Sequence, residues 1–542
     1  MFLKFRRKLG WYFCAAAVCL AASGCAEPGP SIQYKRDVRS LMDAQNFDAA
    51  EHLIEQSRSA QYGDLNSVLF HLDRAVVLHD LERYEESDRE LDAAEMRLDE
   101  LYTQDLSKSA ARYFVHDATE DYRGAPYVRT LLHIYRALNR LYMGQSDEAA
   151  VEARKVSLFL TELREKHDLK LSYSDDAFAH LLSALALEDA GEPDNARLSL
   201  QKSKKAFIAQ SQIFETPVPK HILNDLLFRD PEAEARAAEA QAAPQNPANP
   251  VRALDWRQLS LVQTADEAPA EASTAADASS DAESQTAAAA ADAPSSIESA
   301  DAPTSPGPAA EQPAVRDGEL VFIHYNGLLP YLTEKRIQIA GTQAAIYVQS
   351  HPEELEGRSW QEAHVAALSD ASFVIAVPEL VRESSVVGGS ILECTDGSCP
   401  ATATEIVSNP GAITAKTFAE QIGDIQARAG ARAAIKFALT TVAQAATYAA
   451  LKSQSDIAAE TGALVVGLVG RVASASTEHA DTRSWLTAPA EIRMARIRLH
   501  PGTYHLRIGL TDRSGRVMNY WALPKVEIAP GKRTYQHIRT AY

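Results

Sequence analysis

The chain has 542 residues, with 54 Lys and Arg against 73 Asp and Glu, so its formal net charge is −19. This acidity argues against a protein that coats nucleic acid, because phosphate binding needs a positive field. Five cysteines in a chain of this length exclude a disulfide-dense scaffold and an array of zinc sites. The length favours several domains, each large enough to bury a core.

Residues 1–24 have the three parts of a secretory signal peptide. A basic stretch with Lys4, Arg6, Arg7 and Lys8 precedes an apolar run over residues 11–22 and the small residues Ala22, Ser23 and Gly24. The apolar run is too short for a membrane span, which needs about 20 residues. We therefore expect this segment to direct export.

Residues 22–25, Ala-Ser-Gly-Cys, resemble the lipobox of bacterial lipoproteins. The resemblance implies that Cys25 is acylated (palmitate labelling would detect this) and becomes the first residue of the mature chain. Two or three acyl chains hold a protein stably on a membrane. Ala26, by resemblance to the enterobacterial sorting rule, favours the outer membrane, so we expect a periplasm-facing lipoprotein with residues 25–33 as a tether. An ordinary signal peptide with a chance cysteine is the alternative.

The remaining cysteines predict one disulfide. Cys14 and Cys19 leave with the signal, which leaves Cys394 and Cys399 on either side of an Asp-Gly turn. In an oxidising compartment this spacing favours a small disulfide-closed loop. Half of a metal site is the alternative, but no second Cys pair or nearby His cluster supports it, so we predict no metal and no cofactor.

From about residue 34 to 230 the apolar residues recur with a helical period. Leu131, Ile134, Leu138 and Leu141 mark one helix, and a Gly-Gln-Ser-Asp stop and cap at 144–147 separates it from the next. Four similar junctions predict second helices that begin at Phe47, Tyr84, Ser146 and Pro193. They resemble the junctions of tetratricopeptide (TPR) repeats, but at irregular spacing. We predict a stack of TPR-like helical hairpins, whose concave surface would bind a protein partner.

Residues 231–317 are predicted to be a disordered, acidic Ala/Pro-rich linker. They contain fifteen acidic and four basic residues, and 264–315 hold 19 alanines and no aromatic residue. Such a composition cannot bury enough apolar area to offset its conformational entropy. An acidic docking arm is the functional alternative.

Residues 318–542 are predicted to form a mixed α/β domain. Apolar strands are expected at 320–325 and at 373–377, where Pro378 would end the second, and a hairpin from Ile337 and Ile339 to Ile346 and Val348. A long Ala-rich helix is expected from about 415 to 452, with the glycines of 462–470 packed closely against it. From about 490, alternating strands and Pro-Gly and Ser-Gly turns predict a small β-sandwich-like module.

One polar cluster lies between the helical and β parts of this domain. Residues 477–485 contain Glu478, His479, Asp481, Arg483 and Trp485. As chemistry, Glu478 or His479 would be a general base and Arg483 would hold an anion. As structure, Asp481 would pair with Arg483, cap the turn and hold Trp485 against the sandwich. We favour the structural interpretation and predict no catalytic residue.

Several of these motifs together resemble a family of bacterial TPR-containing envelope lipoproteins that has no established activity. The resemblance rests on the lipobox, on Tyr-Arg-Gly-Ala-Pro-Tyr at 122–127, on Tyr-Arg-Ala-Leu at 135–138, on Gly327-Leu328, and above all on 477–485 with Pro-Ala-Glu-Ile at 489–492. It covers nearly the whole mature chain except the linker. It implies an architecture and a location rather than a reaction.

Two functions from different classes follow. The first is a non-enzymatic cell-envelope lipoprotein that binds a periplasmic protein through its TPR-like domain, in envelope or peptidoglycan assembly. The second is an envelope hydrolase or glycan-binding regulator that uses a cleft near 477–485. Nothing in the sequence favours a nucleic acid as partner.

Overall fold

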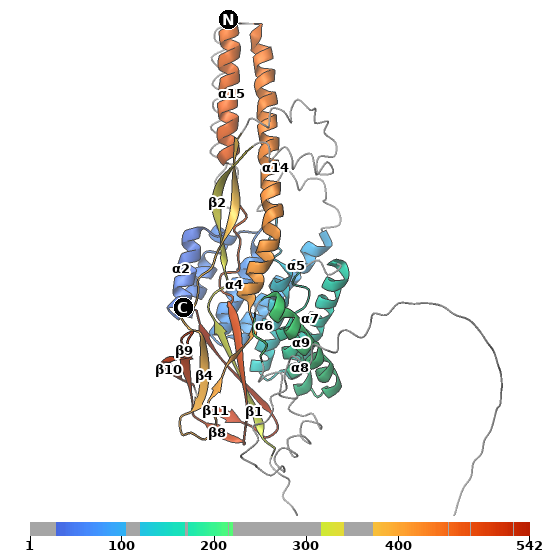
Figure 1. Cartoon of the computed structure of the whole chain (residues 1–542), viewed down its shortest axis with the longest axis vertical. Coiled ribbons are helices and arrows are strands. Elements are labelled where there is room, and N and C mark those ends of the chain that lie inside the picture. Colours follow the sequence, from blue (N-terminus) through green and yellow to red (C-terminus); the bar gives the residue numbers. More distant parts are fainter. Residues whose placement is uncertain are drawn as a thin grey trace, which may run out of the picture. The chain divides into compact units, whose positions relative to one another are not determined.

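The computed structural model describes residues 29–104, 120–167, 172–214, 216–219, 316–340, 372–453, 455–476, 479–523 and 525–541. The parts on either side of 231–314 belong to one compact unit (Figure 1). Its amino-terminal part is helical, and its carboxy-terminal part combines strands with two long helices. The predicted combination of helical and mixed α/β parts is therefore confirmed in outline. The signal peptide, Cys25 and all but the last two residues of the predicted linker lie outside the described residues.

The helical part is a series of hairpins. In chain order its described helices are α2 (Ile32–Asp43), α3 (Phe47–Gln56), the π-helical turn η1 (Arg58–Tyr62), α4 (Ser67–Asp80), α5 (Tyr84–Gln104), α6 (Pro126–Tyr142), α7 (Ser146–His167), α8 (Ala177–Asp189) and α9 (Pro193–Ile213). Each even-numbered helix packs against the next. The second helices begin at Phe47, Tyr84, Ser146 and Pro193, as predicted. The first helix begins at Ile32, inside the predicted tether, because Ser31 caps it.

The four hairpin loops share one conformation. Each has three residues, and the middle one has a positive φ: Gln45, Glu82, Gly144 and Gly191. In each loop the backbone N–H of the last residue donates to a carbonyl five residues back, as Gln145 does to Arg140 and Glu192 to Leu187. This is a helix-ending turn that favours glycine. Two loops have glycine at this position and two do not, so the loop conformation repeats more regularly than the loop sequence does.

The strands form two four-stranded sheets and two smaller ones. In chain order they are β1 (Gly318–Asn326), β2 (Tyr331–Ala340), β3 (Ser372–Val381), β4 (Gly389–Cys394), β5 (Thr402–Ala403), β6 (Glu405–Ser408), β7 (Glu491–Leu499), β8 (Gly502–Tyr504), β9 (Leu506–Thr511), β10 (Val517–Ala522), β11 (Val526–Ile528) and β12 (Arg533–Thr540). The four-stranded sheets have the orders β12-β1-β7-β6 and β10-β9-β4-β5. β1 pairs parallel with β12 and antiparallel with β7.

The two four-stranded sheets share a core and form a sandwich. Leu320, Phe322 and Ile497 from one sheet meet Leu392 and Ile508 from the other. The predicted strands and turns after residue 490 are present, but the expectation of a module that starts there is wrong. Its sheets also contain β1 and β4–β6, because strands after 490 pair with segments far earlier in the chain, as Arg533 of β12 does with Glu319 of β1. The predicted disulfide between Cys394 and Cys399 is confirmed.

The hairpin after β1 differs from its prediction. Ile337 and Ile339 lie in β2, but β2 pairs with β3, and Ile346 and Val348 lie outside the described residues. β3 continues through Pro378 to Val381, with Pro378 opposite Glu334. Proline is tolerated because β2 and β3 form a two-stranded sheet in the described part of the chain, so the missing N–H can face the open edge.

Two long helices connect β6 to β7. α14 (Pro410–Lys452) and α15 (Asp456–Ser476) pack against each other. A Cβ on Gly462 would lie 2.4 Å from Leu451 Cδ1, and one on Gly467 would lie 1.6 Å from Gln444 Nε2. The predicted close packing of these glycines on the Ala-rich helix is confirmed. No helix among the described residues is both long enough and apolar enough to cross a membrane.

The β12-β1-β7-β6 sheet is covered on both faces. One face meets the second sheet, and the other contributes Val321, Ile323 and Tyr325 to the core of the helical hairpins. All nine residues of β1 are buried as a result. The helices that meet this face are the first helices of the hairpins, α4, α6 and α8, which are buried over most of their length. We call this surface the first-helix face.

A buried charge cluster joins α8 to the sheet. The Arg533 guanidinium pairs with Glu319 at 2.5 Å, with Asp189 at 2.8 Å and with Glu188. Arg496 approaches Glu319 at 2.6 Å. Burial raises the pKa of Glu319, but the charges of the two arginines outweigh it and lower this pKa to about 2. The cluster therefore holds ionised groups in the interior, where an unpaired charge is strongly unfavourable.

A second buried cluster joins α4 and α6 to the sheet. The His79 ring lies between those of Tyr135, Tyr325 and His537, with centroids 4.9–5.2 Å away. His79 Nδ1 hydrogen-bonds Asn139 at 2.6 Å, and its Nε2 hydrogen-bonds the Tyr325 hydroxyl at 3.0 Å. Burial lowers the pKa of His79 well below its usual value and that of His537 to about 4. Both rings are therefore neutral at neutral pH.

Candidate functional site

A cavity of about 390 Å³ lies beside the polar cluster predicted from the sequence. Five segments line it: residues 120–127 at the start of α6, residues 329–332 at the start of β2, Leu380 of β3, the first turns of α14, and residues 481–485. Two of these segments, 120–127 and 481–485, carry motifs on which the family resemblance rests. The sequence predicted a cleft near 477–485, but not the parts of α14 that complete it, because those residues are at least 60 positions away in the chain.

Arg483 lines this cavity and binds several groups of the chain. Its Nε and Nη2 donate to the two oxygens of Asp481 at 2.9 and 2.6 Å, and its Nη1 donates to the Glu120 carbonyl at 2.6 Å. The Asp481 carboxylate also accepts the Arg483 backbone N–H, which closes a turn. The predicted pairing and capping are thus present. A bidentate pair of this kind positions the segment. Because the guanidinium nitrogens already donate within the chain, Arg483 is not arranged to bind an anion.

His479 contacts a carboxylate on a different element from Arg483. His479 Nδ1 lies 3.4 Å from Glu334 on β2, and Glu478 lies outside the described residues. Glu334 also accepts the Ala480 backbone N–H at 3.0 Å. Burial raises the pKa of Glu334, but this hydrogen bond and the charge of Arg336 together lower it below its usual range. The described members of the cluster therefore act as two separate structural contacts.

Trp485 is buried in the core shared by the sheet and the helices, and not against the sandwich alone as expected. Its ring lies 6.3 Å from that of Tyr135 on α6. The next two residues are held by Asp73 of α4, whose Oδ1 accepts the backbone N–H groups of Leu486 at 2.7 Å and Thr487 at 3.1 Å. Burial raises the pKa of Asp73 to about 7, although these hydrogen bonds oppose the shift. The sequence contains no signal for Asp73.

Two buried cations of α2 bind backbone carbonyls on the same face. Lys35 Nζ donates to the carbonyls of Thr482 at 2.6 Å and Leu332 at 3.0 Å. Arg39 donates to the Leu329 carbonyl at 2.9 Å and pairs with Glu383. Together with Asp73 of α4, these α2 side chains hold two segments of the chain, around 329–332 and 480–488, by their backbone groups. This is how a helical repeat would hold an extended peptide.

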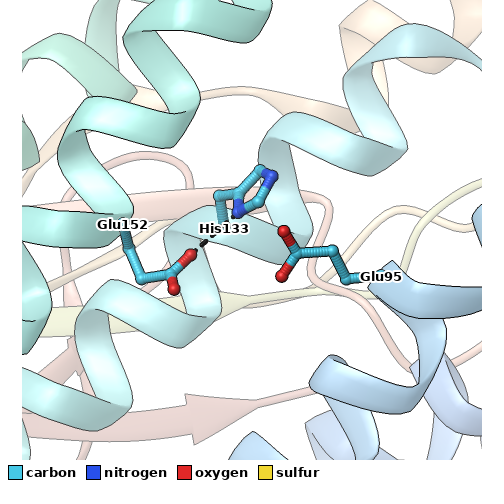
Figure 2. Close-up of side chains that lie close together, drawn as sticks. All are labelled: Glu95, His133 and Glu152. Atoms are coloured by element: carbon cyan, nitrogen blue, oxygen red, sulfur yellow. Dashed lines mark hydrogen bonds and ion pairs between the residues drawn. The ribbon is translucent and has the colours of Figure 1, made fainter. Parts of the chain in front are cut away.

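One group of potential metal ligands occurs among the described residues. Glu95, His133 and Glu152 converge from α5, α6 and α7 (Figure 2), with ligand atoms within 4.8 Å of one another. Two cations already occupy this site: Arg136 pairs with Glu95, and Lys155 Nζ lies 3.1 Å from Glu95 and 3.3 Å from Glu152. Burial raises the pKa of Glu152, but His133 and Arg136 lower it below its usual value. We interpret the group as an ion-pair network between hairpins.

A Ser–His pair has the hydrogen-bond geometry of a nucleophile and its base, but it is buried away from solvent. Ser390 Oγ lies 3.0 Å from His324 Nδ1, and His324 Nε2 lies 2.7 Å from Thr540 Oγ1. Ser390 and His324 are 2% and 0% exposed. Burial lowers the pKa of His324 to about 3. Because no substrate can reach this pair in the folded chain, it is a polar network that joins β1, β4 and β12.

In comparisons with family models, curated proteins and solved structures, nothing matches this chain significantly. The site is therefore interpreted from its own geometry.

Proposed function

We propose that this chain is a non-enzymatic lipoprotein of the bacterial cell envelope, anchored in the outer membrane through Cys25, with a TPR-like stack that serves as a scaffold for a periplasmic protein partner. The repeated loop conformation supports the TPR-like description, since four helical hairpins end and restart through the same three-residue turn. Stacked hairpins of this kind commonly present binding surfaces for proteins.

The cavity carries the proposal. The first-helix face, where a repeat protein would bind a peptide, is covered by the chain's own strands. The cavity next to it has aromatic and proline walls, including Tyr122, Tyr127, Phe418 and Pro330. Of its charged groups, Asp481 pairs with Arg483 and Asp121 with Arg97, and Glu120 and Arg123 also line it. A pocket of this size with aromatic walls fits an apolar side chain of a protein partner.

Site-specific photocrosslinking in cells tests this proposal. A photoreactive residue at Thr417, which lines the cavity, should yield adducts with a specific envelope protein. The matched position is Lys416, the preceding residue of α14, whose exposed side chain is not part of the lining. Equal adducts at both positions, or none at Thr417, would contradict a protein-binding pocket.

A glycan-binding regulator or hydrolase is the second candidate, because aromatic rings with Thr417 and Gln421 also suit an uncharged sugar. Thr417→Trp fills the cavity without touching the Arg483 pairs, and it separates the two candidates. If this variant loses binding to peptidoglycan fragments and Thr417 gives no protein adducts, the second candidate replaces the first. Loss of turnover of a cell-wall substrate would identify a hydrolase.

The anchor has its own test. Cys25→Ala should abolish palmitate labelling and release the protein from the membrane fraction. Retention of the label in this variant would contradict the lipobox interpretation.

A further inference from the structure

Residues 29–31 enter the folded unit directly beside the cavity. Gly29 is half-buried and Pro30 is buried. A Cβ on Gly29 would lie 2.8 Å from Arg483 Cγ, and the φ of Gly29 is +121°, which favours glycine. The backbone N–H of Ser31 donates to Gln61 Oε1 at 2.9 Å. The amino-terminal segment therefore reaches the fold at one fixed point, against Arg483.

Arg483 connects this point to the cavity wall. Its guanidinium carbon lies 5.6 Å from the centre of the Tyr122 ring, and its Nη1 donates to the Glu120 carbonyl at 2.6 Å. Tyr122, Glu120 and Arg483 all line the cavity. Gly29 is thus separated from the cavity by one side chain.

The proposed anchor lies within reach of the same cavity. Cys25 precedes Gly29 by four residues, which span at most about 14 Å, and residues 25–28 lie outside the described residues. A group on so short a tether has an effective concentration on the order of millimolar at a nearby site. An acyl chain on Cys25 would therefore have an advantage over a free ligand of the same chemistry.

The cavity walls suit an acyl chain. Leu332 of β2 and Leu380 of β3 are opposite each other in the two-stranded sheet, and both are half-buried and line the cavity. Phe418 and Pro330 add further apolar surface. The volume of about 390 Å³ lies within the range of pockets that bury a small ligand, about 300–1,000 Å³. An acyl chain needs apolar contact and no hydrogen-bond partner.

We propose that one acyl chain of Cys25 folds back into this cavity while the other chains stay in the membrane. This occupancy rests on the lipid anchor proposed above, and it adds regulation to the proposed function, because a protein side chain has to displace the acyl chain to enter the pocket. The apolar surface of the chain is buried in the bilayer and in the cavity alike, so the hydrophobic effect does not oppose the exchange. With three chains, two remain in the bilayer, which is enough for stable anchoring.

Metabolic labelling with a photoactivatable palmitate analogue tests this occupancy in cells. After irradiation of the membrane-bound full chain, mass spectrometry should find the acylated Cys25 peptide crosslinked to residues 120–127 and 414–421. Thr417→Trp fills the cavity and should reduce these crosslinks at least tenfold. Lys416→Trp changes the preceding, exposed residue of α14 and should leave them unchanged. The wild-type crosslink map does not depend on the folding of either variant.

The outcomes separate the occupant of the cavity from the anchor. If Cys25 takes up the label but its crosslinks lie outside the cavity segments, or if those segments carry a phospholipid adduct instead, the occupancy proposal is wrong and the anchor stands. If the wild type takes up no label, the anchor and the occupancy are both overturned. Equal loss of crosslinks in Thr417→Trp and Lys416→Trp would also contradict an acyl chain held in the cavity.

Discussion

The contact between the helical stack and the sheet differs in kind from the contact between α14 and α15. The first is filled with buried charged and polar groups, such as Arg533 with its three carboxylates, and side chains that hold backbone groups. The second uses glycine and alanine and leaves large apolar side chains exposed. Removing either partner of a buried ion pair leaves an unpaired buried charge, which strongly destabilises the fold. A contact between small side chains can instead shift slightly when one of them changes. The first contact therefore depends on specific buried pairs, and the second depends on the close approach of two helices.

The largest expected effect is at Arg533. Arg533→Met leaves Glu188, Asp189 and Glu319 buried beside one fewer cation, so we expect a loss of about 3–5 kcal/mol in the free energy of unfolding, as for other broken buried pairs. Urea denaturation of the full chain measures it. Arg83→Ala, which breaks the exposed pair with Glu86, should cost below about 1 kcal/mol. Similar losses for the two variants would show that the cluster does not stabilise the contact.

A second prediction concerns pH at the same contact. His537 has a pKa of about 4 in the folded chain, because it is buried, against about 6.5 when unfolded. The unfolded chain therefore binds the additional proton first, and the contribution of His537 to stability is lost as the pH falls from about 6.5 to 4. His537→Gln lacks this term, so the wild type should lose up to about 3 kcal/mol relative to the variant over that range.

Urea denaturation of both proteins at several pH values checks this difference. His79, Tyr84, Tyr142 and Tyr325 surround His537 and remain in the variant. A constant difference between the two proteins across the range would contradict a neutral, buried His537.

The smallest effect is expected in the α14–α15 hairpin. Gly462→Ala meets the ends of two side chains, Leu451 Cδ1 at 2.4 Å and Thr447 Cγ2 at 3.3 Å, and alanine favours the helix, so stability should change by less than about 1 kcal/mol. Gly388→Ala is the matched change in the sandwich, where a Cβ would lie 2.5–2.7 Å from backbone atoms of Asp512 and Arg513. That variant should cost at least about 2 kcal/mol. Thermal unfolding compares them, and a larger loss at Gly462 would contradict the difference between the contacts.

Local patterns in the sequence predicted the local structure well. The starts of four helices, the long helix near 415–452, the strands after 490 and the disulfide all follow from periodicity, caps and turns. The pairing of β1 with β7 and β12 could not be predicted, because it joins segments more than 160 residues apart. The same limit applies to Asp73 and Lys35, whose backbone partners lie more than 290 positions away. At the candidate site, the Asp481–Arg483 pair could be predicted because its members are two residues apart.

Amide hydrogen exchange of the full mature chain tests most directly whether the helical stack and the sheet unfold as one cooperative unit. We expect the slowest amides of α4 and α6 and those of β1 and β7 to exchange through one opening, with free energies equal within about 1 kcal/mol. Exchange of β1 and β7 through an opening at least about 2 kcal/mol smaller, while α4 and α6 stay protected, would show that the sheet leaves the first-helix face readily and would contradict a single unit.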